Sequence, residues 1–275
     1  MEFLKIDETK CKKDGICINE CPGNLIRFQE DTGYPGIFPN GDRACNRCGH
    51  CVAVCHHGAL THSAIPVEDC PSIKPELSLN EEQAIQFVRS RRSIRDYKDK
   101  PVEKEKIKRL IEVARYAPTG GNGQLLEWLV LTDKTRMNKI AGLAVDSIRR
   151  DIKENPQALE LQPYLPMVVK AWEAGYDIIL RNAPVLVVAS APKEAPDGMV
   201  DLSLALSYLD LMAPTMGMGT CWAGLLQHAV LSSPSLKEFL GVPVEHPYLY
   251  PMMLGYPKAK YYRLPGRKPP KITFR

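Results

Sequence analysis

Residues 45–55 read CNRCGHCVAVC, and the four cysteines in this stretch are separated by two, two and three residues. Three thiolates on such a tight loop bind three irons of one iron–sulfur cube, and the fourth cysteine reaches a second cluster. A pair of cysteines two residues apart also suits tetrahedral zinc, but a zinc knuckle does not need the whole run. The stretch therefore predicts a small iron–sulfur domain, with zinc as the alternative.

An earlier stretch, residues 11–22, repeats this run imperfectly. Cysteines stand at its first, third and fourth places, and the second place holds Asp14. In the interleaved arrangement, one cluster is bound by Cys21, Cys45, Cys48 and Cys51. The other cluster is bound by Cys11, Cys17 and Cys55. Asp14 is then either a fourth, oxygen ligand of this second cluster or no ligand at all.

Residues 1 to about 62 resemble a bacterial ferredoxin with two clusters, because of these two runs and of Cys21-Pro22. The resemblance implies two 4Fe-4S clusters. Asp14 in place of cysteine resembles ferredoxins whose affected cluster is either 3Fe-4S or a 4Fe-4S cluster with a labile, Asp-bound iron. His56 stands where proline usually follows the last cysteine, which changes the local turn more than the ligand set.

The other cysteines and histidines near these runs have two interpretations each. The chain has nine cysteines, an odd number that indicates metal or redox chemistry rather than a disulfide scaffold. Cys70 is either a structural residue of the linker or a further ligand. The histidines are either ligands or exposed loop residues: His50, His56, His57 and His62.

The composition describes a globular protein large enough for two domains. The chain has 275 residues and 30.8 kDa, with 44% hydrophobic and 25% charged residues. No apolar stretch reaches the length of a membrane span, and residues 1–13 carry charges where a secretory signal is apolar, so we expect a cytoplasmic protein. A net charge of +4, without a basic run interleaved with aromatics, does not indicate nucleic-acid binding.

Charge and proline content divide the chain near residue 70. Residues 1–70 hold 7 Lys+Arg and 10 Asp+Glu, a net charge of −3, which leaves 29 and 22 for the remainder, a net charge of +7. Three prolines, Pro66, Pro71 and Pro75, then interrupt any regular pattern. We expect a domain at 1–65, a linker at 66–79 and a second domain at 80–275.

The second domain is expected to alternate helices and strands around one sheet, which places it in the α+β class. Asn80 with Gln83 resembles a helix N-cap, and a second helix follows Pro101. A further helix covers 199–215, and Pro214 ends or bends it. Short apolar or β-rich runs predict strands at 128–132, 184–191 and 249–254.

Three segments of this domain suit a flat ligand that carries a phosphate, although each alone also fits a solvated turn. Residues 89–95 (RSRRSIR) combine hydroxyls with guanidinium groups, which form bidentate bonds to phosphate oxygens. Residues 117–124 (APTGGNGQ) have three glycines, which let backbone approach a flat ligand, and two amide side chains. Residues 216–224 (MGMGTCWAG) follow an apolar helix and again expose backbone beside a flat side chain.

Together and in this order, the three segments resemble the FMN-dependent nitroreductase family from about residue 80 to the end. Tyr97, Pro101-Val102 and the segment LGYP at 254–257 add to the resemblance. It implies an α+β sandwich that forms a homodimer, with FMN in the subunit interface. Leu125-Leu126 stands where the family usually has Pro-Trp, which puts the wall of the substrate pocket in doubt but not the cofactor.

The resemblance also implies roles for individual residues. The FMN phosphate and ribityl chain would be bound by Arg91, Arg92, Ser93 and Arg95, with further contacts from Arg267 and Lys268. Asn122 and Gln124 would contact the flavin ring. The backbone around Cys221, Trp222 and Gly224 would lie near the reactive edge of the flavin, although Cys221 and Trp222 also suit core packing. No catalytic acid is assigned, because the chemistry belongs to the cofactor.

A ferredoxin fused to a nitroreductase resembles a group of mainly anaerobic proteins. We expect an FMN-dependent oxidoreductase that passes electrons from its clusters to FMN and on to a small acceptor such as a nitro compound or a quinone. One alternative is an electron-relay module that serves a protein partner. Another is a flavin reductase driven by NAD(P)H, and the lack of a Rossmann-type glycine motif does not decide against it, because nitroreductases take nicotinamide directly over the flavin.

Overall fold

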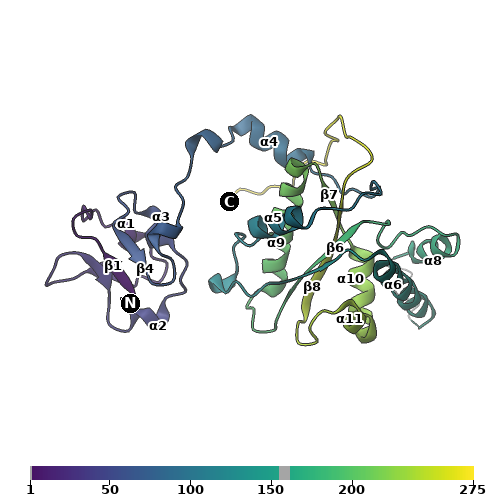
Figure 1. Ribbon diagram of the computed structural model, residues 1–275, viewed down its shortest axis with the longest axis horizontal. Coiled ribbons are helices and arrows are strands. Elements are labelled where there is room, and N and C mark those ends of the chain that lie inside the picture. Colours follow the sequence, from purple (N-terminus) through teal and green to yellow (C-terminus); the bar gives the residue numbers. More distant parts are fainter. Residues whose placement is uncertain (1, 155–161) are drawn as a thin grey trace. The chain divides into compact units, whose positions relative to one another are not determined.

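The computed structural model describes residues 2–154 and 162–275, and it divides into two compact units (Figure 1). The first unit comprises Met1–Ser78 and Gly121–Gly123, and the second comprises Leu79–Gly120 and Gln124–Arg275. Within the two described ranges, no helix has both the length and the apolar character that crossing a membrane requires.

The first unit is built from two small antiparallel sheets and short helices. Strand β1 (Leu4–Ile6) pairs with β4 (Leu60–His62), and β2 (Ile26–Phe28) pairs with β3 (Pro35–Ile37). The helices are α1 (Ile16–Asn19), α2 (Gly41–Ala44) and α3 (His50–Val54), and 3-10 turns follow at Val67–Asp69 and Pro75–Leu77. The core of this unit is small and consists of Leu4, Cys17, Ile26, Val52 and Leu60.

Two glycines hold equivalent positions in the two cysteine runs. Gly15 has φ 73° and precedes α1, and Gly49 has φ 77° and precedes α3. Because this left-handed conformation is strained for residues with a Cβ, both runs need glycine where the loop turns into the helix. Each turn is followed two residues later by a cysteine, Cys17 and Cys51 respectively.

The second unit contains one four-stranded sheet with the order β5-β6-β8-β7, in which all neighbours are antiparallel. Its strands are β5 (Glu127–Leu131), β6 (Val185–Ala191), β7 (Gly219–Trp222) and β8 (Tyr248–Gly255). The three strands expected from the sequence are confirmed to within one residue at each end. Strand β7 differs from expectation, because its segment is a largely buried strand rather than exposed backbone.

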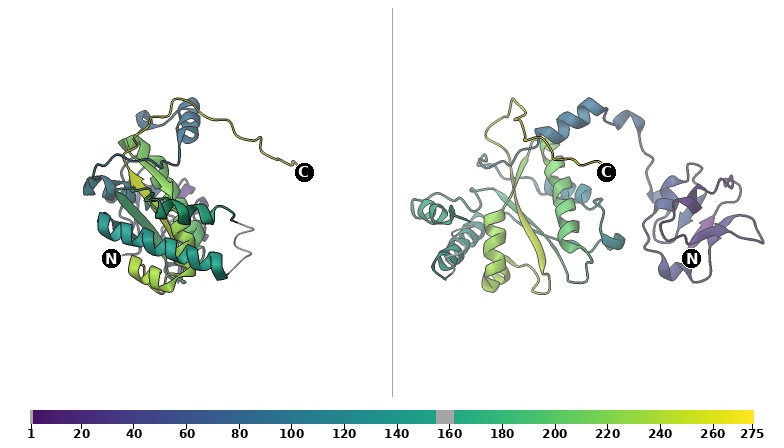
Figure 2. Two further views of the ribbon diagram at one scale, coloured as in Figure 1. Left: turned by 90° about the vertical axis from the view of Figure 1, so that its right-hand side faces the viewer. Right: turned by 180° about the vertical axis from the view of Figure 1, so that it is seen from behind.

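Helices cover both faces of this sheet, which confirms the expected α+β sandwich (Figures 1 and 2). On one face lie α5 (Lys104–Ala114) and α9 (Gly198–Met212), which pack with Val185, Val187 and Ala189 of β6. On the other face, which holds Leu186 and Val188, lie α6 (Lys134–Glu154), α8 (Leu165–Glu173), α10 (Gly224–Ser232) and α11 (Pro234–Leu240). Strand β6 is buried along its whole length because both faces are covered.

Helix α4 (Glu81–Ser90) begins with the predicted cap. The amide of Gln83 donates to Asn80 Oδ1 at 2.9 Å, and the amide of Asn80 donates to Gln83 Oε1 at 3.1 Å. No residue of α4 is buried, and its apolar side chains Ile85 and Val88 are 46% and 58% exposed. The predicted effect of Pro214 is also confirmed, since α9 gives way to a 3-10 turn at Ala213–Met216.

Candidate functional sites

The first unit brings together the four thiols expected to share one cluster. Cys21, which follows α1, lines a cavity of about 210 Å³ with the three cysteines of the loop before and within α3: Cys45, Cys48 and Cys51. Burial raises the pKa of Cys51 to about 11, because the thiolate loses solvation. Four soft sulfur donors around one cavity fit an iron–sulfur cluster or zinc, and binding either would displace the thiol protons.

Backbone amides and one imidazole point at the cysteine sulfurs. Leu25 N donates to Cys21 Sγ at 3.3 Å, and Ala59 N donates to Cys55 Sγ at 3.4 Å. Such N–H groups stabilise negative charge on sulfur and so tune the potential of a bound cluster.

His62 is buried rather than exposed, and its ring faces Cys45. Its Nδ1 accepts a hydrogen bond from Ala64 N at 2.9 Å, so a neutral ring carries its proton on Nε2. That Nε2 lies 3.8 Å from Cys45 Sγ. Burial, and then the charge of Arg47, lowers the pKa of His62 and favours the neutral ring. His62 therefore directs an N–H group at a predicted cluster ligand, which is a role that the sequence did not reveal.

The other predicted ligands gather around a second, tighter cavity of about 20 Å³. Its lining includes Cys11, Asp14, Cys17 and Cys55. Burial first, then the neighbouring thiols and Asp14, raises the pKa of Cys17 to about 11. Cysteines of both runs thus meet in both cavities, as the interleaved arrangement requires.

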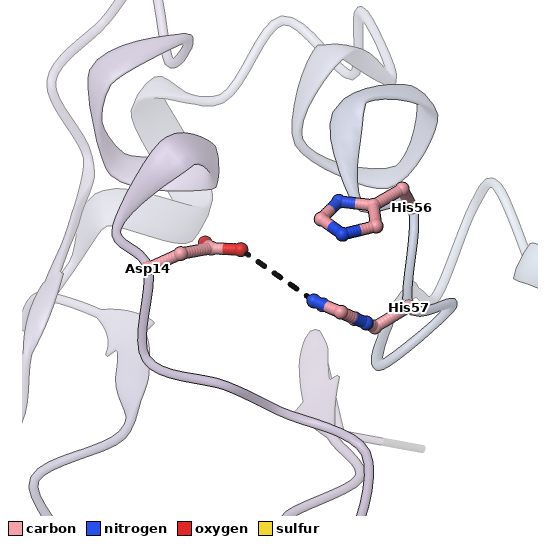
Figure 3. A group of neighbouring side chains, drawn as sticks. All are labelled: Asp14, His56 and His57. Atoms are coloured by element: carbon pink, nitrogen blue, oxygen red, sulfur yellow. Dashed lines mark ion pairs between the residues drawn. The ribbon is translucent and has the colours of Figure 1, made fainter.

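Asp14 contacts groups other than cysteine. Its Oδ1 accepts a hydrogen bond from Ile16 N at 3.1 Å, and its Oδ2 lies 3.9 Å from His57 Nε2. Figure 3 shows the carboxylate directed toward His57, with the ring of His56 beside it. His57 also lines the second cavity.

In the second unit, four of the predicted flavin-binding residues line one cavity of about 270 Å³. They are Arg95, Cys221, Trp222 and Gly224. Strand β7 supplies Cys221 and Trp222, and α10 begins at Gly224. Burial raises the pKa of the Cys221 thiol, although the nearby Arg95 and Arg181 oppose this effect. A cavity with cationic and aromatic side chains in its walls fits part of a flavin nucleotide.

Arg91 is joined to this cavity through a buried carboxylate. Asp210 of α9 is 4% exposed, and its Oδ2 accepts hydrogen bonds from Arg91 Nη1 and Trp222 Nε1, both at 3.3 Å. The hydroxyl of Thr220 donates to its other oxygen. Ile94 N donates to Thr220 O at 2.8 Å, so the arginine-rich turn runs along β7. The sequence signal for this residue is a carboxylate in an otherwise apolar helix, since α9 holds Asp201 and Asp210 among mostly apolar residues.

The other predicted flavin residues lie elsewhere in the chain. Arg92 donates to the carbonyl oxygens of Arg89 and Arg91, at 3.0 and 2.6 Å, and so folds back on the end of α4. Arg267 and Lys268 are exposed in the C-terminal segment. Asn122 and Gln124 have positive φ values of 58° and 51°. Among the residues that the structure describes, the following do not line the cavity around Arg95: Arg92, Asn122, Gln124, Arg267 and Lys268.

The cavity also contains residues that the sequence analysis did not single out. Arg181 and Tyr164 lie in its wall. Arg181 and Asn182 are consecutive non-glycine residues with φ of 57° and 50°, a conformation that costs free energy and is often found at functional sites. The Asp177 carboxylate fixes this turn, because it accepts hydrogen bonds from the amides of Leu180 and Asn182, both at 2.9 Å.

Comparison with known proteins identifies both units. Residues 88–256 match the model of the nitroreductase family, and residues 9–59 match that of a 4Fe-4S dicluster domain. The protein is therefore an oxidoreductase that belongs to the nitroreductase family and carries an N-terminal ferredoxin-like iron–sulfur domain. The two resemblances inferred from the sequence are confirmed.

Individual relatives agree with this assignment. The chain is 30% identical over 190 residues to an FMN reductase (NAD(P)H) of Bacillus subtilis, covering 66% of this chain and 70% of the relative. It is 26% identical over 204 residues to a 4-nitrobenzoate reductase of Nocardioides, covering 64% and 81%. A crystal structure of a nitroreductase with bound FMN from Bacteroides fragilis superposes with a TM-score of 0.57 at 21% identity, covering 71% of this chain and 99% of that one. The last comparison shows a shared fold.

Proposed function

We propose that this protein passes electrons from two iron–sulfur clusters in its first unit to FMN in its second unit, and from FMN to a small acceptor such as a nitro compound or a quinone. The observation that carries the proposal is the pair of cavities that collect seven cysteines and Asp14, on one chain with a nitroreductase-family unit. A cubane cluster transfers one electron at a time and FMN stores two, so two clusters match the capacity of one flavin.

The cluster ligands in this proposal follow the two cavities. The larger cavity holds a 4Fe-4S cluster on its four cysteines, Cys21, Cys45, Cys48 and Cys51. The smaller one holds a cluster on Cys11, Cys17 and Cys55, which is 3Fe-4S unless Asp14 supplies the fourth ligand. In both cases the surrounding N–H groups supply positive dipoles toward the sulfurs.

For FMN, we propose that Arg91, Arg92, Ser93 and Arg95 meet the phosphate and the ribityl chain, with Arg267 and Lys268 as further cations. Asn122 and Gln124 would address the flavin ring, and the backbone near Cys221, Trp222 and Gly224 would lie at its reactive edge. The bonds from Asp210 to Arg91 and Trp222 support this assignment, because they tie the predicted phosphate side to the predicted ring side.

We also propose that the site is completed in a homodimer. Within residues 2–154 and 162–275, Gln124 is not among the residues that line the cavity around Arg95. The exposed Leu79, Ile85 and Val88, on and just before α4, offer apolar surface for a second copy. Light scattering of the FMN-loaded protein tests this, and a monomer with full flavin content would contradict it.

NAD(P)H is the second candidate for the electron donor. The Bacillus subtilis relative is described as an NAD(P)H-dependent FMN reductase. In that case electrons would enter at the flavin, and the clusters would carry them outward.

A stopped-flow experiment on anaerobically purified protein separates the two directions. Iron, sulfide and flavin are determined first, and the clusters are then reduced with a limiting amount of dithionite and mixed with a nitro compound or a quinone. Cluster absorbance should bleach on reduction and recover on mixing. Cys48→Ser should slow the recovery, while Ser63→Ala serves as a control in the same unit. When the protein is mixed with NADH instead, flavin reduction that precedes cluster reduction would favour the second candidate. Absence of flavin, or zinc in place of iron, would refute both.

A further inference from the structure

Three metal-binding side chains converge beside the smaller cysteine cavity. The carboxylate of Asp14 and the imidazoles of His56 and His57 place their ligand atoms within 4.8 Å of one another (Figure 3). Asp14 lies just before α1, and the two histidines directly follow Cys55 at the end of the second cysteine run. The two cysteine runs therefore bring together the three side chains.

The contacts between these side chains leave room for an ion. The 3.9 Å between Asp14 Oδ2 and His57 Nε2 exceeds the length of a hydrogen bond. The rings of His56 and His57 are 3.7 Å apart between centroids. Within residues 2–154 and 162–275, neither imidazole has a hydrogen-bond partner, whereas Asp14 Oδ1 is held by Ile16 N. One fixed carboxylate thus presents its second oxygen to the imidazole of His57, its ion-pair partner, with the imidazole of His56 close by.

The donor set indicates which ion fits. Two histidines and one carboxylate, open to solvent on the remaining sides, are the donors of mononuclear ferrous sites and also suit other divalent first-row metals. Asp14 and His57 are partly exposed, so water can complete the coordination. The negative net charge of residues 1–70 favours a cation at this position.

We infer that Asp14, His56 and His57 form a binding site for a divalent transition-metal ion, with ferrous iron as its occupant. Ferrous iron is favoured because the adjoining cavity offers only three cysteines, so that iron in excess of a three-iron cluster meets nitrogen and oxygen donors at its edge. Binding is a ligand exchange in which the protein side chains replace water molecules bound to Fe²⁺. The ion keeps its oxidation state, and the imidazoles bind as neutral rings. The inference about these three side chains rests on the proposed function only in the choice of iron.

Isotope labelling tests the site in the full-length, anaerobically purified protein. Protein produced with natural iron is mixed with one equivalent of ⁵⁷Fe²⁺ and desalted, so that Mössbauer spectroscopy detects only the added ion. The double variant His56→Gln/His57→Gln removes both imidazoles but keeps neutral side chains of similar polarity. His50→Gln is the matched control, because it changes an exposed histidine of the same unit.

The expected result is a high-spin ferrous spectrum with nitrogen and oxygen ligands in the wild type and in His50→Gln. The double variant should retain about tenfold less of the label or lose it altogether, since even outer-shell changes weaken metal sites by that factor. Label in a sulfur environment, label lost on desalting from the wild type, or equal retention by the double variant would each overturn the inference. Circular dichroism checks that the variants fold. The prior iron and sulfide count shows separately whether the clusters of the proposed function exist.

Discussion

Replacing Asp210 should destabilise the second unit, because this buried carboxylate accepts hydrogen bonds from three side chains. Asp210→Ala leaves the Trp222 N–H and the Thr220 hydroxyl, which belongs to a residue only 1% exposed, without an acceptor. Each such group costs about 1–3 kcal/mol. Arg91 adds less, because its side chain is 31% exposed and can turn to water. We expect unfolding free energy to fall by about 3 kcal/mol.

Asp210→Asn should cost only about 1 kcal/mol, because the amide matches the shape of the carboxylate. Its oxygen accepts from Arg91 and Trp222, and its NH₂ group donates to the Thr220 hydroxyl, which can accept in turn. The difference between the two variants therefore measures the hydrogen bonds apart from the charge.

Tryptophan fluorescence during urea unfolding measures these changes for the second unit alone. The three tryptophans of the chain, Trp128, Trp172 and Trp222, all lie in this unit. Asp99→Ala is the control, since it removes an exposed ion pair and should leave the midpoint unchanged. Equal stability of Asp210→Ala and the wild type, or equal losses in both Asp210 variants, would show that the buried network does not act as described. FMN affinity should fall in the same order as stability.

Three further predictions concern single positions. Gly219→Ala drives a Cβ into the side chain of Ile94, whose own Cβ would lie 3.0 Å away, and should cost about 2 kcal/mol in urea unfolding. Burial raises the pKa of Tyr97 above its ordinary value of 10.0, so its stabilising effect is complete below pH 10 and declines above it. Tyr97→Phe serves as the reference, although it also lacks the hydrogen bond to Ile94 O. Relative to this variant, the unfolding free energy of the wild type should fall by up to about 1.4 kcal/mol per pH unit above pH 10. His62→Leu removes the N–H group that faces Cys45 Sγ, so EPR-monitored titration should give a cluster potential lower by an amount on the order of tens of millivolts, and an unchanged potential would contradict this role.

The elements that could be predicted are those whose own residues determine them. The continuous apolar run of β6 predicts a strand covered on both faces, and the side chains of Asn80 and Gln83 form the cap that starts α4. Strand β7 could not be predicted, because four residues that include a glycine show no strand periodicity. Its conformation depends on the ladder with β8, in which Thr220 pairs with Leu254 from a distant part of the sequence.

The same distinction applies to the candidate sites. Cysteine spacing predicts the two groups of thiols, because a short loop can direct its sulfurs in few ways. Arg181 could not be predicted, since an ordinary turn sequence does not reveal that Asp177 holds it in a left-handed conformation at a cavity. His62 was ambiguous for a similar reason, because its burial depends on the pairing of β4 with β1.

Helix α9 contacts all three of the predicted flavin-binding motifs, which are far apart in sequence. It carries two buried carboxylates: Asp201 Oδ1 accepts a hydrogen bond from Gly120 N at 2.9 Å, and Asp210 binds Arg91 and Trp222. Nine residues at about 100° each place the two on opposite sides of the helix. A buried carboxylate is unfavourable unless its partners satisfy it, so each one fixes the loop that it binds. The apolar helix therefore sets the positions of the arginine-rich turn, the glycine loop and β7 together. A substitution that shifts any one of them should also shift the other two.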